Sequence, residues 1–413
     1  MLYLLVMKKT GKKTQLTALV VLLIAALWLC SCEPVSKIAD VAENITRDVP
    51  SAKNTLTTRL EIIRAMEEAM SAGESELTFN VAGMVENELR VIGDNMSAFW
   101  GKPTHYTIIN EFKNIEGVFP DRPVDIKTIT NSFELSYNYY VYDFIINGTA
   151  IPDEFPRAKE IAAALPGIAA GVFRDPFASD FEKVLAAHDW LVANLEYDVS
   201  TPSISDENST YGAFILKRTM CQGYAEALEL LLRCYTDVET VQIVGEAMNT
   251  ALFGNDVEQP DARNDWRGHA WNAVKIDGDW YQVDTTFNDP LGNPTGRVTH
   301  FYFGQSDGVM LKNHRWEFDY FPASYAGDFL FFRETGLFAE DWDSFQAIVE
   351  SLLAEAPDEE PVDFLEVAVR GTTITEDNIQ FVYKAVNNLD AILWSEQVWN
   401  DVHVHSIELV YNS

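Results

Sequence analysis

Apolar positions divide the chain into three patterned regions, each with helical spacing in some segments and strand-like alternation in others. In the first region, residues 54–154, the pattern predicts helices, a strand and β-rich aromatic segments. These are a helix over 56–72, a strand over 77–81, a second helix over 85–96, and β-rich segments over 105–112 and 133–144. We expect this region to form a small α/β domain.

The C-terminal region, residues 329–413, has a similar outline. Its predicted elements are a helix over 342–354, a strand over 364–369, a helix over 376–386 and a strand over 402–410. Helix–strand–helix–strand order thus occurs at both ends of the chain, which is consistent either with a duplicated accessory domain or with chance recurrence.

The central region, residues 155–328, carries the most specific local signals. Ser179 and Glu182 form a capping-box pattern that opens a helix, and His188 lies on the apolar stripe of that helix. We therefore interpret His188 as a core histidine. Further on, the pair Asp277–Gly278 between two apolar runs predicts a tight β-hairpin.

The N-terminus has the pattern of an export signal. Four lysines between residues 8 and 13 precede an apolar run over 16–29, which has the length of a signal-peptide core. The run ends in Leu-Cys-Ser-Cys, which resembles a bacterial lipobox with Cys32 as the lipidated residue, although Cys30 replaces the usual small residue or valine. The resemblance implies a signal peptide over 1–32, a tether over 33–53 and an exported lipoprotein anchored on the outer face of the cell membrane. An uncleaved anchor and a secreted form are the alternatives.

Composition limits the classes of partner. The 413 residues include 63 acidic and 30 basic side chains, for a net charge of −33, and 47 % are hydrophobic, enough for a packed core. Such a surface repels nucleic acid and anionic lipid, so we expect no nucleic-acid partner. The acidity either keeps an exported protein soluble or attracts a cationic substrate.

Two cysteines remain if Cys30 leaves with the signal and Cys32 carries lipid. Cys221 and Cys234 fall on one predicted helix, about 20 Å apart along its axis, which is beyond disulfide reach. Cys221 falls at the start of this helix, where unpaired N–H groups and the helix dipole favour a thiolate and can stabilise an oxyanion. Cys234 has neither advantage, so we expect it to be packed.

The hairpin brings a histidine and a carboxylate together. A two-residue turn pairs Ile276 with Asp279, and counting outward places Asp284 on the same face as His269 and diagonal to it. Their side chains can then form a hydrogen bond, which leaves the second imidazole nitrogen free to take a thiol proton. A three-residue turn with a bulge would reverse the faces and break this inference.

The order of three segments, MCQGYAE at 220–226, HAWN at 269–272 and WYQVDT at 280–285, resembles the transglutaminase-like superfamily, which is related in architecture to papain-like thiol proteases. The match spans about 181–316. It implies an α+β fold, with a cysteine-bearing helix packed on an antiparallel sheet that bears histidine and aspartate. It also implies that Cys221 is the nucleophile, His269 the base and Asp284 the orienting acid, with no cofactor. The side chain that completes the oxyanion hole is not identifiable from the sequence.

Three functions are compatible with this resemblance. The favoured one is hydrolysis of amide bonds in a protein or peptide, including a cell-wall-associated one, through a thioester on Cys221. The second resolves the same thioester with an amine and gives cross-linking. In the third, the triad is vestigial and the flanking domains bind a partner at the surface. The substrate and the oligomeric state stay open.

Several other residues are weaker candidates. His300 and His314 either shape the cleft or are structural, and Trp271, Trp280 and Tyr281 either line a substrate groove or pack. His403 and His405 alternate on a predicted strand, and without further ligands we expect no metal site there.

Overall fold

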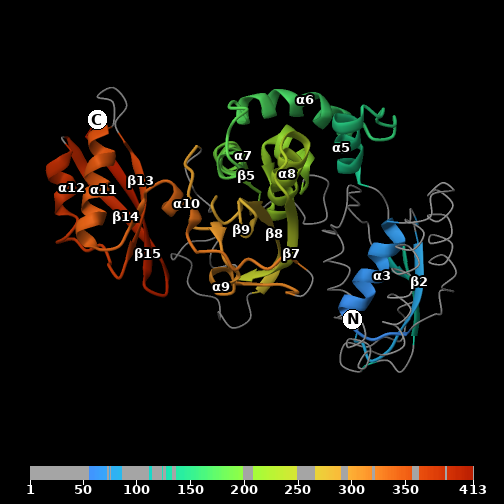
Figure 1. The fold of residues 1–413 in the computed structure, drawn as a ribbon. Coiled ribbons are helices and arrows are strands. Elements are labelled where there is room, and N and C mark those ends of the chain that lie inside the picture. The colour runs from blue at the N-terminus through green and yellow to red at the C-terminus, as the bar shows by residue number, and fades with distance from the viewer. Residues whose placement is uncertain are drawn as a thin grey trace, which may run out of the picture. The chain divides into compact units, whose positions relative to one another are not determined.

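The computed structural model describes most of the chain after residue 54 (Figure 1). The described residues are 55–71, 74, 76–85, 111–113, 123, 127–132, 136–198, 208–248, 266–289, 296–318, 321–355, 362–386 and 388–412. The predicted signal peptide and tether therefore lie outside the described residues. Helices and sheets are combined throughout, and the α+β class predicted from the sequence is confirmed.

The first sheet has the order β1-β2-β4-β3 and is accompanied by helix α3. In α3, Ile62, Met66 and Ala69 are buried at helical spacing, and in β2 the buried positions alternate. The predicted helix over 56–72 and strand over 77–81 are confirmed, whereas the predicted helix over 85–96 lies outside the described elements. The bounds are β1 Thr55–Leu56, α3 Arg59–Ser71, β2 Glu76–Val81, β3 Glu111–Lys113 and β4 Lys127–Ser132.

The β-rich prediction for residues 133–144 is wrong, because helix α5 occupies Tyr137–Asn147. Its aromatic residues have high strand propensity, but local caps and tertiary packing override that preference. The Ser136 side chain accepts a hydrogen bond from the N–H of Asn138, and Gly148 ends the helix with a φ of 73°. Tyr140 also stacks on Phe155, with the ring centroids 4.3 Å apart.

In the centre, helix α8 packs against α5, α6 and α7 and also on strands β7 and β8 (Figure 1). The five-stranded sheet has the order β10-β9-β8-β7-β11, and its paired strands are antiparallel. The capping box at Ser179 and Glu182 is present at the start of α7, as predicted. The helices are α6 Pro156–Val172, α7 Asp180–Asn194, the π-helical turn Gly212–Leu216, α8 Cys221–Tyr235 and α9 Asp307–Met310. The strands are β5 Glu196–Tyr197, β6 Arg218–Thr219, β7 Thr240–Met248, β8 Trp266–Ile276, β9 Asp279–Val283, β10 Phe303–Gln305 and β11 His314–Arg315.

The β8–β9 hairpin has the predicted register. Asp277 and Gly278 both have positive φ, at 53° and 95°, as a two-residue type I′ turn requires. Ile276 pairs with Asp279, and the ladder continues to the pair Asn272 and Val283. Residues separated by more than ten positions in the sequence are thereby fixed relative to one another by a two-residue turn.

The last sheet has the order β12-β13-β15-β14. One face packs with α11 and α12, while Ala368, Val402 and Val404 on the other face join the apolar cluster of the central region. The predicted helix over 342–354 and the strands over 364–369 and 402–410 are confirmed, but strand β14 was missed. β14 pairs only with β15 and has a single buried residue, so its apolar pattern is weak. The elements are α10 Leu330–Glu334, β12 Phe338–Ala339, α11 Trp342–Glu355, β13 Phe364–Arg370, α12 Gln380–Ala385, β14 Leu389–Trp399 and β15 Val402–Tyr411.

Candidate active site

Cys221 is the first residue of α8 and is partly exposed. The preceding residue, Met220, provides no side-chain cap, so no side chain competes for the N–H groups of the first turn. Gly223 allows a close approach, because a Cβ there would lie 2.0 Å from the Thr219 hydroxyl oxygen and 2.7 Å from the Ser209 carbonyl oxygen. The sulfur is therefore held at an uncapped helix start that can receive negative charge.

His269 lies in the middle of the sheet, on β8, and is buried. Its partner on β7 is Gly245, where a Cβ would lie only 2.2 Å from the carbonyl oxygen of Arg315. Because Gly245 has no side chain, strand β11 can lie close to strand β7 next to the histidine strand. The imidazole also contacts the Phe287 ring, with the centroids 4.6 Å apart.

Asp284 immediately follows β9 and is fully buried. Its Oδ2 lies 2.7 Å from Nε2 of His269, and its Oδ1 accepts a hydrogen bond from the N–H of Phe287 at 3.0 Å. Burial alone would favour the neutral acid. The charge and hydrogen bonds of His269 and His314 outweigh burial and hold the pKa of Asp284 well below its usual range.

Only one of the two nitrogens of the His269 ring is in contact with Asp284. Nε2 is engaged by Asp284, so Nδ1 is the ring nitrogen available to the Cys221 side chain. Burial disfavours the imidazolium, but Asp284 and then Cys221 favour it, and together they raise the pKa of His269 to about 10. Asp284 and Cys221 thus both favour the protonated form of the imidazole.

Two buried hydrogen bonds tie the cysteine helix to the hairpin. The Tyr224 hydroxyl, on α8, donates to the Asp289 carboxylate at 2.5 Å, just beyond Asp284. The Asn272 amide, on β8, donates to the carbonyl oxygen of Ala225 on α8 at 3.0 Å. Both elements are therefore fixed by contacts other than those of the reacting groups themselves.

His314 is a site residue whose role the sequence left open. It is fully buried on β11, and its Nε2 lies 2.9 Å from Oδ2 of Asp284, the same oxygen that His269 engages. No local signal gives this contact, because β11 has only two residues and reaches the site by pairing with β7. His300, by contrast, makes its polar contacts with Asp189 and Glu366.

The aromatic residues considered for a substrate groove are mainly packing residues. Trp271 is 1 % exposed, and its indole N–H donates to Gln282 at 2.5 Å. Trp280 and Tyr281 are partly buried against the apolar cluster of the central region. Cys234 is packed as expected, and burial raises the pKa of its thiol to about 12, so it is not an activated cysteine.

Tyr197 is a further neighbour of Cys221 that the sequence did not single out. It lies on β5, which pairs in parallel with β6 immediately before the cysteine helix. Burial is the main cause that raises the pKa of the Tyr197 phenol, and the interactions with Cys221 and Asp284 raise it further. The protonated form of the phenol, which can donate a hydrogen bond, is therefore favoured.

Residues 170–285 match the family model described as "Transglutaminase-like superfamily". The mouse Kyphoscoliosis peptidase is 31 % identical over 143 residues, which cover 33 % of this chain and 21 % of that protein. The human Kyphoscoliosis peptidase is 29 % identical over the same length and with the same coverage. The chain thus spans about a fifth of the length of these curated relatives. A crystal structure of a TGase is 14 % identical, with a TM-score of 0.24, over 54 % of this chain and 53 % of the other.

The match covers the start of the cysteine helix, the histidine strand and the aspartate. Within residues 170–285, the chain is therefore similar to the transglutaminase-like superfamily.

Proposed function

We propose that this protein is an exported, membrane-tethered thiol enzyme that hydrolyses amide bonds in proteins or peptides through a thioester on Cys221. The observation that carries the proposal is the 2.7 Å contact between Nε2 of His269 and Oδ2 of Asp284, together with the effect of Cys221 on the pKa of the same imidazole. An imidazole held in this way can move a proton to and from the thiol while the carboxylate fixes its orientation.

In the proposed reaction, the Cys221 sulfur attacks the carbonyl carbon of the amide and forms a carbon–sulfur bond. Backbone N–H groups in the first turn of α8 stabilise the resulting oxyanion. His269 gives its Nδ1 proton to the leaving amine as the carbon–nitrogen bond breaks, which leaves a thioester and a neutral ring. The ring then takes a proton from water, and the water oxygen attacks the thioester and releases a carboxylic acid and the cysteine.

Hydrolysis is favoured over the alternatives by the relatives of the central segment. Both curated relatives are named peptidases, and their similarity covers the part of the chain that holds the proposed triad. Transamidation uses the same residues and differs only in the acceptor that attacks the thioester. A purely binding role would leave unexplained why a buried aspartate and a buried histidine form a contact in a fold that also places Cys221 at an uncapped helix start.

Export and lipidation rest on the N-terminal pattern. Within the part of the chain that the structure describes, no helix is long and apolar enough to cross a membrane. We propose that the attachment is through lipid on Cys32, after removal of the preceding signal sequence.

Cys221 is expected to react rapidly with iodoacetamide at acidic pH. The thiolate is the reactive form of a cysteine, and a neighbouring imidazolium such as that of His269 favours it. His269→Ala should therefore slow labelling at pH 6 by at least about tenfold, as measured by mass spectrometry of the Cys221 peptide. Cys234→Ser is the matched control and should leave the rate unchanged. Labelling no faster than that of free cysteine would contradict the proposal.

Amide hydrolysis should have an alkaline limit of its own. The pKa of His269 is raised to about 10, so the proton donated to the leaving amine is present below that pH and is lost as the pH rises through it. We expect the hydrolysis rate to fall near pH 10 while iodoacetamide labelling, which needs no proton donor, does not fall. Parallel loss of both reactions would indicate unfolding instead.

Tyr197→Phe separates oxyanion stabilisation from thiol activation. We propose that the Tyr197 hydroxyl is the side-chain donor to the oxyanion, in addition to the helix N–H groups. Loss of such a donor typically costs about 10²–10³-fold in turnover. The variant should lose amide hydrolysis on this scale and keep the labelling rate with iodoacetamide, a reaction that forms no oxyanion. Equal loss in both assays would assign Tyr197 a structural role.

The acceptor can be identified directly. A glutamine-containing protein offered with a fluorescent primary amine should be cleaved or deamidated without incorporation of the label. Incorporation that depends on Cys221 would replace hydrolysis with transamidation. The Cys221→Ser variant provides the background for both readouts.

Lipidation is tested by growing producing cells with a clickable palmitate analogue. Incorporation into the protein should disappear in Cys32→Ser and persist in Cys30→Ser if the latter is still processed. Incorporation that survives Cys32→Ser would overturn the assignment of Cys32.

A further inference from the structure

We propose that Glu396, His403 and His405, on the last sheet, form a binding site for a divalent transition-metal ion of the zinc class. Three groups of histidine and carboxylate side chains in the described part of the chain have ligand atoms within 4.8 Å of one another. The other two groups are His188 with Asp189 and His300, and His269 with Asp284 and His314. The protonation that the neighbouring residues impose distinguishes the three groups.

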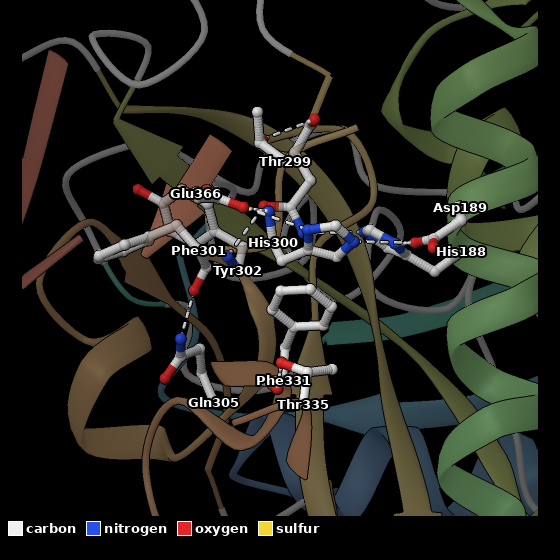
Figure 2. Close-up of polar contacts among 11 residues, drawn as sticks. His188, Asp189, Thr299, His300, Phe301, Tyr302, Gln305, Phe331, Thr335 and Glu366 are labelled. Atoms are coloured by element: carbon white, nitrogen blue, oxygen red, sulfur yellow. Dashed lines mark hydrogen bonds and ion pairs between the residues drawn. The ribbon is translucent and has the colours of Figure 1, made fainter. Parts of the chain in front are cut away.

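The first group includes His188, which Figure 2 shows beside Asp189 and His300, and hydrogen bonds from Asn288 and to Asp189 fix the His188 tautomer so that no lone pair is left for an ion. The Asn288 carbonyl oxygen accepts from the N–H of Tyr302 at 2.9 Å, which fixes the orientation of the amide. Its amino group therefore faces Nε2 of His188, at 2.8 Å, and donates to it. Nδ1 of His188 must then carry the proton that it donates to Asp189 at 2.8 Å, so it has no lone pair for an ion.

His300 completes that group as a cation. Its Nε2 lies 3.1 Å from the Asp189 carboxylate and its Nδ1 lies 3.1 Å from Glu366, so both nitrogens face acceptors (Figure 2). Burial disfavours the charged ring, but these two carboxylates raise the pKa of His300 to about 9. The ring stacks on Phe331 with the centroids 3.6 Å apart. A protonated imidazole cannot be a ligand, and the group is satisfied as a network of ion pairs.

The second group belongs to the proposed active site. Both His269 and His314 direct Nε2 to one oxygen of Asp284. An ion there would displace the contacts on which the proposed acyl transfer depends.

The third group has the geometry of a metal site. His403 and His405 are two residues apart on β15 and share a face, and Glu396 on β14 is the cross-strand partner of His405. Oε1 of Glu396 lies 2.8 Å from Nδ1 of His403 and 3.6 Å from Nε2 of His405. Nitrogen and oxygen ligands at the usual distance from tetrahedral zinc are about 3.3 Å apart, which lies between these two separations.

A fourth ligand is available from the turn after β13. The carbonyl oxygen of Thr372 lies 3.0 Å from Nε2 of His405, on the nitrogen that also faces Glu396. An ion bound by both histidines and Glu396 would therefore have a backbone oxygen or a water molecule as its fourth ligand. It would link β14, β15 and the turn that follows β13.

The protonation of His405 also permits a ligand role. Its Nε2 carries the proton that it donates to the Thr372 carbonyl oxygen at 3.0 Å, whereas in the described structure its Nδ1 is buried and has no hydrogen-bond partner. Moving the proton from Nε2 to Nδ1 frees the lone pair that faces Glu396.

The site is accessible to an ion. The side chains of His403 and Glu396 are 17 % and 26 % exposed, whereas the His405 side chain is fully buried. Two neutral imidazoles and one carboxylate suit zinc and its neighbours rather than calcium or magnesium, which prefer oxygen ligands. The sequence alone gave no such site, because the third ligand lies on β14, a strand that its weak pattern did not predict.

The test is a titration of the full-length protein with Zn²⁺, without a histidine tag. The Cys221→Ser background removes the thiol at the proposed active site as a competing ligand. Isothermal calorimetry should give one ion per chain, and the thermal unfolding temperature should rise with Zn²⁺ concentration. Adding Glu396→Gln should weaken binding by at least about 100-fold and abolish the thermal shift.

Asp189→Asn is the matched control, since it alters the other histidine–carboxylate group outside the active site and should leave Zn²⁺ affinity unchanged. His403→Gln replaces Glu396→Gln if the latter has an altered circular dichroism spectrum. Absence of binding at micromolar Zn²⁺, or equal binding by the variants of Glu396 and His403, would overturn the proposal. Loss of binding in Asp189→Asn alone would also overturn it and assign the ion to the group in Figure 2.

Discussion

The central region depends on one buried negative charge. The Asp284 carboxylate is fully enclosed, and a lone carboxylate in such a place would cost several kcal/mol or protonate. Two imidazoles and a backbone N–H compensate it, from strands β8 and β11 and from the turn that follows β9. Because the donors come from separate segments, the carboxylate charge is stabilised only when the sheet is correctly assembled. The contacts that form the candidate active site therefore also stabilise the fold of the central region.

Close backbone approach makes this arrangement sterically feasible. Gly245 lets β11 lie against β7 so that His314 can reach Asp284, and Gly223 lets the first turn of α8 sit against the segment that leads to Cys221. The hydrogen bonds from Tyr224 and Asn272 then join helix and hairpin. The reacting groups are positioned by neighbours that take no part in the proposed chemistry, which is the usual basis of preorganisation.

What could be predicted from the sequence was local. The turn at Asp277 and Gly278 sets the hairpin register, and that register places Asp284 on the side of His269 before any tertiary contact is known. The cysteine helix was equally readable from its apolar spacing. Helix α5 was misread because its caps and its stacking on Phe155 override aromatic strand propensity. The contact between His314 and Asp284 was not predictable, since it depends on a two-residue strand that pairs across the sheet.

The contact between His300 and Glu366 has a consequence for how the chain can be divided. The sequence pattern of the chain favoured a domain boundary near residue 328, with a separate domain on the C-terminal side. Yet the charge on His300 is balanced partly by Glu366 on β13, and its ring lies on Phe331 of α10, both beyond that boundary. A chain that ended at residue 328 would leave the His300 imidazolium with only one of its two carboxylate partners. One face of its ring would also lose the contact with Phe331. The two regions are therefore separable as patterns in the sequence, but they are electrostatically a single unit.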